Sequence, residues 1–295
     1  MKRRRSGVWL RGTVVLGTLA SGGATAAEPV PMVLATTPKY TDEIRVVDGN
    51  LATARPGHHA ELMQDAGKRC GAAITFRFLP WQRALLEVRN GDIDGAFSAS
   101  YDPERATYGA YPLADGKPDP SRALKGYSYS LYVRHDSGLN WDGRTVGGAE
   151  LPIAVERGAS IIPRVRDLGL ASVEIADNTT MLRMVAGGGR VAAAALITPA
   201  ADAILDKTPE LRATVVKLEP PLEDKFGYVM LSKPFQGRHP ALAECFWTML
   251  RDIRQTPEHA ERVKSYQAET PISQGPATQQ IPAQASGQGS VGNPS

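Results

Sequence analysis

Two serines and an arginine follow a short apolar run in the segment GAFSASYDPER, which spans residues 95–105. Ser98 and Ser100 place hydroxyl groups at the end of this run, and Asp102 opens a turn that puts Arg105 in the first turn of a helix. A guanidinium is a planar fork that binds a carboxylate through two hydrogen bonds. The spacing predicts an anion site at a strand end. A strand end with solvated serines and an ion-paired arginine is the alternative.

A second polar turn occurs in RGAS, between the strand pattern PIAVE and a helical pattern. Gly158 allows a close approach of the backbone, Ala159 follows it, and Ser160 fits the N-cap of the next helix. Helix N-termini present unpaired N–H groups and the positive end of the helix dipole. We predict that these three residues form a second anion-binding turn. An ordinary helix cap is the alternative.

Aromatic side chains near the predicted strand ends are candidates for an apolar wall of the same site. Tyr40 follows the first strand and Trp81 follows the second, and packing in the core is the alternative for each. His58 and His59 stand at a helix start, where we expect both to be solvated. No spacing of cysteine and histidine suggests a metal site, and no cofactor is expected.

Strands and helices alternate around these residues. Two rounds of strand–helix–strand pattern, one before and one after a turn-rich stretch, predict an α/β protein with two similar lobes. Two further strand patterns, YSYSLYV and KFGYVMLS, connect the rounds, so we expect the chain to cross twice between the lobes. A cleft between hinged lobes is the natural place for a ligand, because strand ends of both lobes face it.

The ends of the chain differ from its middle. The start has a basic head, an apolar run interrupted by Arg11 and small residues before Ala26, which is typical of a cleaved secretory signal. The end is rich in Gly, Pro, Gln, Ser and Ala and has no charged or aromatic residue, which predicts disorder. The expected organisation is a signal peptide at 1–26, the first part of lobe 1 at 28–126, lobe 2 at 127–224, a return to lobe 1 with C-terminal helices at 225–270, and a tail at 271–295.

The net charge argues against a nucleic-acid partner. The whole chain has 34 basic and 31 acidic residues, but five of the basic ones lie in the predicted signal. The remaining 29 basic residues are slightly outnumbered by the acidic ones, so the apparent basic character comes from the signal.

The chain has two cysteines, Cys70 and Cys245. An exported protein meets an oxidising compartment, so a disulfide is one possibility and two buried free thiols are the other.

The stretch PWQRALLEVRNGDIDGAFSASYDPER resembles the core of the family 3 extracellular solute-binding proteins, which have the type II periplasmic binding fold. The resemblance covers about residues 30 to 268. It implies that Arg105 grips a ligand carboxylate, that Ser98 and Ser100 bind beside it, and that the turn at Gly158–Ser160 completes the site. It also implies that Tyr40 and Trp81 form its apolar wall.

One departure from the family pattern concerns the ligand's ammonium group. Amino-acid binders of this family place an aspartate at the end of the strand that here ends in Ile197 and Thr198. Burying an unpaired ammonium would be costly, so Asp177 and Asn178 are the candidates to replace that residue. The first strand's exit also lacks the usual Pro-Pro-Phe. We therefore expect a small carboxylate-bearing polar solute, either an amino acid or a related organic acid.

The resemblance implies a monomeric periplasmic binding protein that delivers its solute to an ABC-type permease in the membrane. One alternative is an enzyme on the same scaffold, similar to the dehydratases that act on cyclic acids. Its acid or base would come from Glu156, Asp177 or Glu104. The other alternative is an accessory module that senses a ligand without transporting it.

Overall fold

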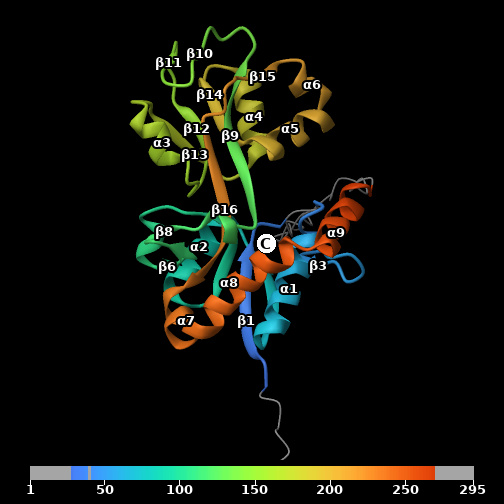
Figure 1. Cartoon of the computed structure of the whole chain (residues 1–295). Helices are drawn as coiled ribbons and strands as arrows, with labels where there is room; N and C mark the ends of the chain where they lie inside the picture. Colours follow the sequence, from blue (N-terminus) through green and yellow to red (C-terminus); the bar gives the residue numbers. More distant parts are fainter. Residues whose placement is uncertain (1–27, 39–40, 270–295) are drawn as a thin grey trace, which may run out of the picture.

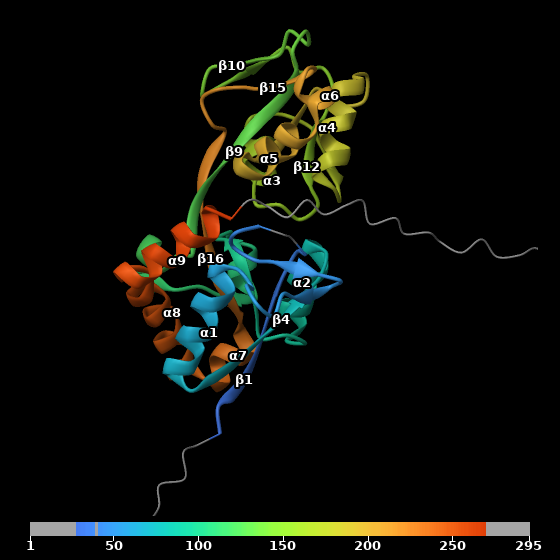
Figure 2. The same cartoon turned by 90° about the vertical axis from the view of Figure 1, so that its right-hand side faces the viewer.

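The computed structural model describes residues 28–38 and 41–269 (Figure 1). They form two lobes, one above the other in Figure 1, and the turned view of Figure 2 shows the same separation. The predicted signal peptide, the predicted tail and Tyr40 lie outside the described residues.

Two long antiparallel strands run between the lobes, β9 (Lys125–Arg134) and β16 (Glu223–Ser232). They pair from Glu223 opposite Tyr129 to Gly227 opposite Lys125, which is the region where the two lobes meet. The two crossings expected from the sequence are therefore present, and the α/β winding is confirmed. The residue limits assigned to each lobe stay a prediction.

Lobe 1 contains both the first part of the chain and its last described helices. Its main strands are β1 (Val30–Thr36), β4 (Ala72–Phe78), β5 (Gly95–Ser100) and β6 (Gly109–Ala110), and its helices are α1 (His58–Cys70), α2 (Trp81–Asn90), α7 (Lys233–Arg238), α8 (Pro240–Arg254) and α9 (Pro257–Gln267). Short hairpins join β2 (Val46–Val47) to β3 (Asn50–Leu51) and β7 (Leu113–Ala114) to β8 (Lys117–Pro118).

Lobe 2 is formed by the middle of the chain. Its strands are β10 (Asn140–Trp141), β11 (Val146–Gly147), β12 (Ile153–Glu156), β13 (Ser172–Ile175), β14 (Ala193–Ile197) and β15 (Val215–Lys217), and its helices are α3 (Ile162–Asp167), α4 (Asn178–Gly187), α5 (Thr198–Lys207) and α6 (Pro209–Arg212). Neither α5 nor α6 was expected from the sequence.

One mixed sheet continues through both lobes in the order β13-β12-β14-β9-β16-β5-β1-β4. The strands within each α/β unit are parallel, and the crossing strands are antiparallel to their neighbours. In lobe 1, α1 and α8 cover one face of the sheet and α2 covers the other, so apolar side chains of both strand faces are buried. The strand ends of both lobes consequently face the gap between them.

The two cysteines form a disulfide between α1 and α8. The Cα atoms of Cys70 and Cys245 lie 5.9 Å apart, although 175 positions separate them in the sequence. Of the two possibilities left open by the sequence, the structure has the bridge. No helix within 28–38 and 41–269 combines the length and apolar character needed to span a membrane.

Removing this bridge should lower the free energy of unfolding. A cross-link that closes so long a loop reduces the entropy of the unfolded chain, which corresponds to about 2 to 5 kcal/mol. We expect the double variant Cys70→Ser/Cys245→Ser to unfold at a clearly lower urea concentration than the native protein. A reducing agent should lower the urea midpoint of the native protein and leave that of the variant unchanged. Equal urea midpoints for the two proteins would show that the bridge contributes nothing.

The histidines at the start of α1 are buried, so the expectation that they are solvated is wrong. His58 and His59 are 7% and 3% exposed, because α9 packs over them and brings His259 against His58 with ring centroids 6.2 Å apart. Within the described part of the chain, the Nδ1 atom of each of the three has no hydrogen-bond partner. Burial lowers the pKa of His259 to about 4 and holds the pKa of His59 well below its usual value.

These depressed pKa values predict a loss of stability in weak acid. An unfolded histidine takes up its proton near pH 6.5, whereas folded His259 resists it down to about pH 4. The unfolded state therefore binds more protons across this window, and stability falls as the pH falls through it. We expect His259→Gln to lose less stability than the native protein between pH 7 and pH 5 in urea titrations. The exposed His135→Gln is the control and should behave as the native protein; a native-like loss in His259→Gln would refute the assignment.

Candidate functional site

A cavity of about 730 Å³ lies between the lobes and is lined by both of them. This size lies within the range of small-molecule sites. Seven of the nine residues predicted to bind a ligand line it: Trp81, Ser98, Ser100 and Arg105 from lobe 1, and Ala159, Ser160 and Asn178 from lobe 2. Gly158 lies beside the cavity without lining it, and Tyr40 is outside the described residues. We call this cavity the cleft.

Ser98 faces the cleft from an irregular position in β5. The pairing of β5 with β16 passes from Ala99 opposite Tyr228 to Phe97 opposite Val229, so Ser98 has no partner in the ladder. Its φ of 58° is in the left-handed region, which a serine seldom adopts. A bulge of this kind bends a strand and re-aims a side chain. Here the bulge places the hydroxyl-bearing Ser98 at the cleft. In a regular strand the side chains would have gone on alternating between the two faces of the sheet.

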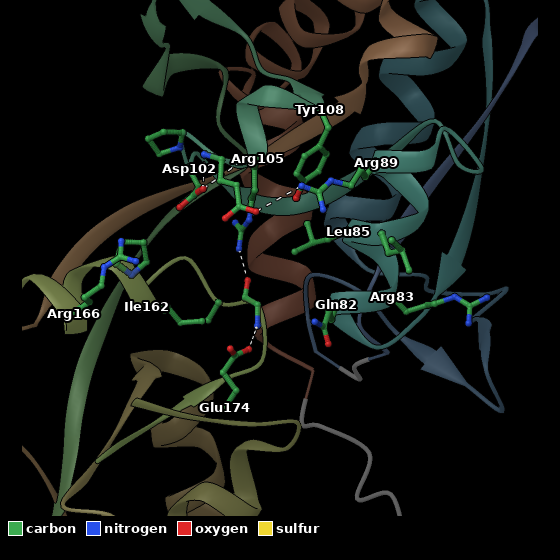
Figure 3. A pocket seen from close by; sticks show the side chains of 16 residues that line it. Gln82, Arg83, Leu85, Arg89, Asp102, Arg105, Tyr108, Ile162, Arg166 and Glu174 are labelled. Carbon is green, nitrogen blue, oxygen red and sulfur yellow. Dashed lines mark hydrogen bonds and ion pairs between the residues drawn. The ribbon is translucent and has the colours of Figure 1, made fainter. Parts of the chain in front are cut away.

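Arg105 begins a short 3₁₀ helix after the turn predicted from the sequence. The Asp102 carboxylate accepts hydrogen bonds from the backbone N–H groups of Glu104 at 2.9 Å and of Arg105 at 3.2 Å. This local cap fixes where the arginine leaves the backbone. The side chain is 5% exposed and is directed into the gap between the lobes (Figure 3).

The guanidinium of Arg105 contacts both lobes. Its Nη1 donates to the carbonyl oxygen of Ser100 at 3.0 Å, and its Nη2 donates across the gap to the carbonyl oxygen of Gly158 at 2.7 Å. The Trp81 ring lies beside it, with its centroid 5.5 Å from Cζ. Tyr111 also donates to the Ser100 carbonyl, at 3.0 Å. No carboxylate of the described residues forms an ion pair with this guanidinium.

Ser160 makes a second contact between the lobes. Ser100 Oγ donates to Ser160 Oγ at 2.5 Å, and both residues are buried. The prediction that Ser160 caps a helix is wrong, because α3 begins at Ile162 and its N-cap residue, Ile161, makes no side-chain cap. The hydroxyl of Ser160 bonds to lobe 1 instead.

Gly158 faces a different hollow from the one expected. Its N–H donates to the Glu174 carboxylate at 3.0 Å, and its carbonyl accepts from Arg105. Both contacts lie on a groove of about 850 Å³ behind the Arg105–Gly158 contact, seen in Figure 3 between Arg105 above and Glu174 below. We call it the rear groove. The left-handed φ of 71° at this position suits a glycine. A role for Gly158 in ligand binding stays a prediction.

Two tyrosines of the crossing strand also line the cleft, and they were not among the residues selected from the sequence. Tyr127 and Tyr129 both point to it from β9. Burial raises the pKa of each phenol; Arg105 opposes this rise and Glu156 adds to it. The alternation in YSYSLYV could have revealed them, since every second side chain of a strand shares one face.

Comparisons with known proteins agree with this architecture. No protein-family model matches the chain, and no curated protein matches it in sequence. A mutant of ArgBP from T. maritima is similar in structure, with a TM-score of 0.59 and 16% identity over 81% of this chain and 96% of that one. AbpA from Streptococcus pneumoniae, an amino acid ABC transporter substrate-binding protein bound to L-arginine, has a TM-score of 0.59 and 17% identity, and the match covers 80% of this chain and 94% of that one. A histidine kinase sensor domain with similarity to periplasmic binding proteins has a TM-score of 0.62 and 15% identity, and the match covers 82% of this chain and 97% of that one.

The described part of the chain therefore has the two-lobed fold of the type II periplasmic binding proteins, as the resemblance in its sequence implied. The matching chains are covered almost completely, so both lobes take part in the likeness.

The hydroxyl contact between the lobes predicts the effect of Ser160→Ala. A single hydrogen bond contributes about 1 kcal/mol. Losing it should therefore lower the ratio of molecules whose lobes are in contact (closed) to molecules whose lobes are apart (open) by about fivefold. We expect a larger radius of gyration in small-angle X-ray scattering without ligand. Ser172→Ala, at an exposed position of β13 in the same lobe, is the matched control. Superimposable curves for Ser160→Ala and the native protein would contradict the proposed contact.

Proposed function

We propose that the protein captures a small carboxylate-bearing polar solute between its two lobes. The observation that carries this proposal is the buried guanidinium of Arg105, which lines the cleft and has no acidic partner among the described residues. A buried charge is stable only when hydrogen bonds and an opposite charge offset its lost hydration. A ligand carboxylate would supply the missing negative charge.

The neighbouring residues suit the same ligand. Its carboxylate would meet the hydroxyl-bearing Ser98 and Ser100 beside Arg105, and the turn at Ala159 and Ser160 would approach from lobe 2. Trp81 and Asn178 would form opposite walls. Because these groups come from both lobes, a ligand that touches all of them favours the closed state. The crossing strands β9 and β16 would act as the hinge.

Transport is the favoured biological role. The predicted signal peptide places the protein in the periplasm, where it would act as a monomer and deliver its solute to an ABC-type permease. AbpA and a second structural neighbour are described as substrate-binding proteins of amino acid ABC transporters, which supports this role. The structural neighbours compared above are binding proteins or sensor domains rather than enzymes, and Glu104, one candidate acid, lines the rear groove and not the cleft.

Sensing is the second candidate, because the neighbour with a TM-score of 0.62 is a kinase sensor domain. Uptake of the labelled solute by cells that lack this protein separates the two roles. Lost uptake supports transport, whereas normal uptake with an altered transcriptional response to the solute supports sensing.

The test of the binding site is calorimetry with amino acids and organic acids on Arg105→Lys. Lysine keeps the charge but loses the fork that binds a carboxylate through two hydrogen bonds. We expect at least about tenfold weaker binding of the tightest ligand, with unchanged circular dichroism. Arg89→Lys, in the rear groove outside the cleft, is the matched control and should bind normally. Native affinity in Arg105→Lys, or no binding of any acid to the native protein, would overturn the proposal.

A further inference from the structure

The turn after β12 contacts Arg105 with a backbone carbonyl, while its first two N–H groups are bonded within lobe 2. The N–H of Arg157 donates to the carbonyl oxygen of Ile175 at 3.0 Å. The N–H of Gly158 donates to the Glu174 carboxylate, also at 3.0 Å. The group that reaches across the gap is the carbonyl of Gly158, which accepts from Arg105 at 2.7 Å. Gly158 therefore links an acid of lobe 2 to the cation of lobe 1.

Both acceptors of these N–H groups belong to β13, the edge strand of the sheet in lobe 2. β12 and β13 are parallel and pair up to Glu156 opposite Ile175, so the turn after β12 begins beside the end of β13. Glu174 is the next-to-last residue of β13, and it lines the rear groove and not the cleft. Figure 3 shows Glu174 on one side of this groove and Arg105 on the other. The carboxylate therefore reaches the turn from outside the ligand site.

The backbone of Gly158 depends on outside contacts for its orientation. Its φ of 71° is in the left-handed region, which a glycine enters and leaves without steric cost. The residue itself therefore does not fix the direction of its carbonyl. The hydrogen bond to Glu174 holds the N–H of the same residue, and this sets the direction in which the carbonyl points toward Arg105.

The turn also packs against α2 of lobe 1. A side-chain carbon at Gly158 would lie 3.6 Å from Cδ1 of Leu85 and 3.9 Å from Cβ of Gln82, which are ordinary packing distances. The two lobes are thus in contact at this point, and a rotation of the turn would change both the packing and the hydrogen bond to Arg105. A hydrogen bond weakens steeply as its angle departs from linearity, so a small rotation is enough to lose the contact between the lobes.

We propose that Glu174 is a positioning residue for ligand capture, which holds the Gly158 turn in the orientation that meets Arg105. It acts from the rear groove as a hydrogen-bond acceptor and does not line the cleft. This inference rests on the proposed function and adds to it a residue that controls the lobe junction from outside the ligand site. Because the hydrogen bond is the active property, a neutral acceptor of the same length replaces the carboxylate, and a shorter acid does not.

Three variants of Glu174 separate the hydrogen bond from the charge. Glu174→Gln keeps an acceptor oxygen at the same distance and removes the charge. Glu174→Asp keeps the charge but draws the carboxylate back by about 1.5 Å, beyond hydrogen-bond distance of the Gly158 N–H. Glu174→Ala removes both. The residue is exposed, so these changes leave the core intact, and Glu150→Ala, at an exposed position of lobe 2 outside the cleft and the rear groove, is the matched control.

Two measurements are made on each variant. Small-angle X-ray scattering without ligand reports the lobe junction; Glu174→Ala and Glu174→Asp should lower the ratio of closed to open molecules about fivefold and increase the radius of gyration. Calorimetry with the tightest ligand among amino acids and organic acids reports capture, and the same two variants should bind it about fivefold more weakly. Glu174→Gln and Glu150→Ala should give the native curve, and affinities within about twofold of the native protein.

Three results would overturn the inference: a native scattering curve or native affinity in Glu174→Ala, equal losses in Glu174→Gln and Glu174→Ala, or native behaviour of Glu174→Asp. The proposed function fails separately. If an acid binds in a manner that depends on Arg105 but not on Glu174, the carboxylate site stands and the role of Glu174 is refuted. If no acid binds the native protein, the proposed function is refuted, and the scattering curves alone decide whether Glu174 sets the lobe junction.

Discussion

The buried guanidinium of Arg105 is the constraint on which the rest of the site depends. A buried charge needs hydrogen bonds to offset its lost hydration. The carbonyl oxygens of Ser100 in one lobe and Gly158 in the other accept such bonds from the guanidinium. Carbonyl dipoles stabilise the cation without neutralising it. The junction of the lobes therefore keeps a positive charge facing the cleft, and the relative position of the lobes is tied to the group that would meet a ligand.

The continuous sheet fixes the position of the residues around Arg105 at the lobe junction. β5 carries Ser98 and Ser100 to the lobe junction, and the antiparallel strands β9 and β16 continue the same sheet into lobe 2. The bulge at Ser98 interrupts the ladder at the point where the strand reaches the cleft. The lobe closure that we propose would bend the two crossing strands, because β5 and β14 on either side of them are held by parallel pairing within their own lobes.

Lobe 1 is reinforced on the face away from α2. The disulfide joins α1 to α8, and α9 packs over the start of α1 and buries its histidines. The backbone carbonyls of Asp42 and Glu43, two residues that line the cleft, accept from the N–H groups of His58 and His59. The reinforced face is thus connected to the cleft through the first turn of α1, so this part of the cleft is held by the same packing that buries the histidines.

The sequence alone determined the features that depend on local pattern. Alternating apolar runs and helix caps predicted the α/β winding and the crossing strands, and the spacing of Ser98, Ser100 and Arg105 predicted residues that do meet in the cleft. Only the tertiary structure decided which distant groups meet. It paired Cys70 with Cys245, buried His58 and His59 beneath α9, turned Ser160 from a helix cap to Ser100, and brought Tyr127 and Glu156 to the cleft. The physical reason is that periodicity and capping act over a few residues, whereas burial and contacts across the lobes depend on how separate elements pack.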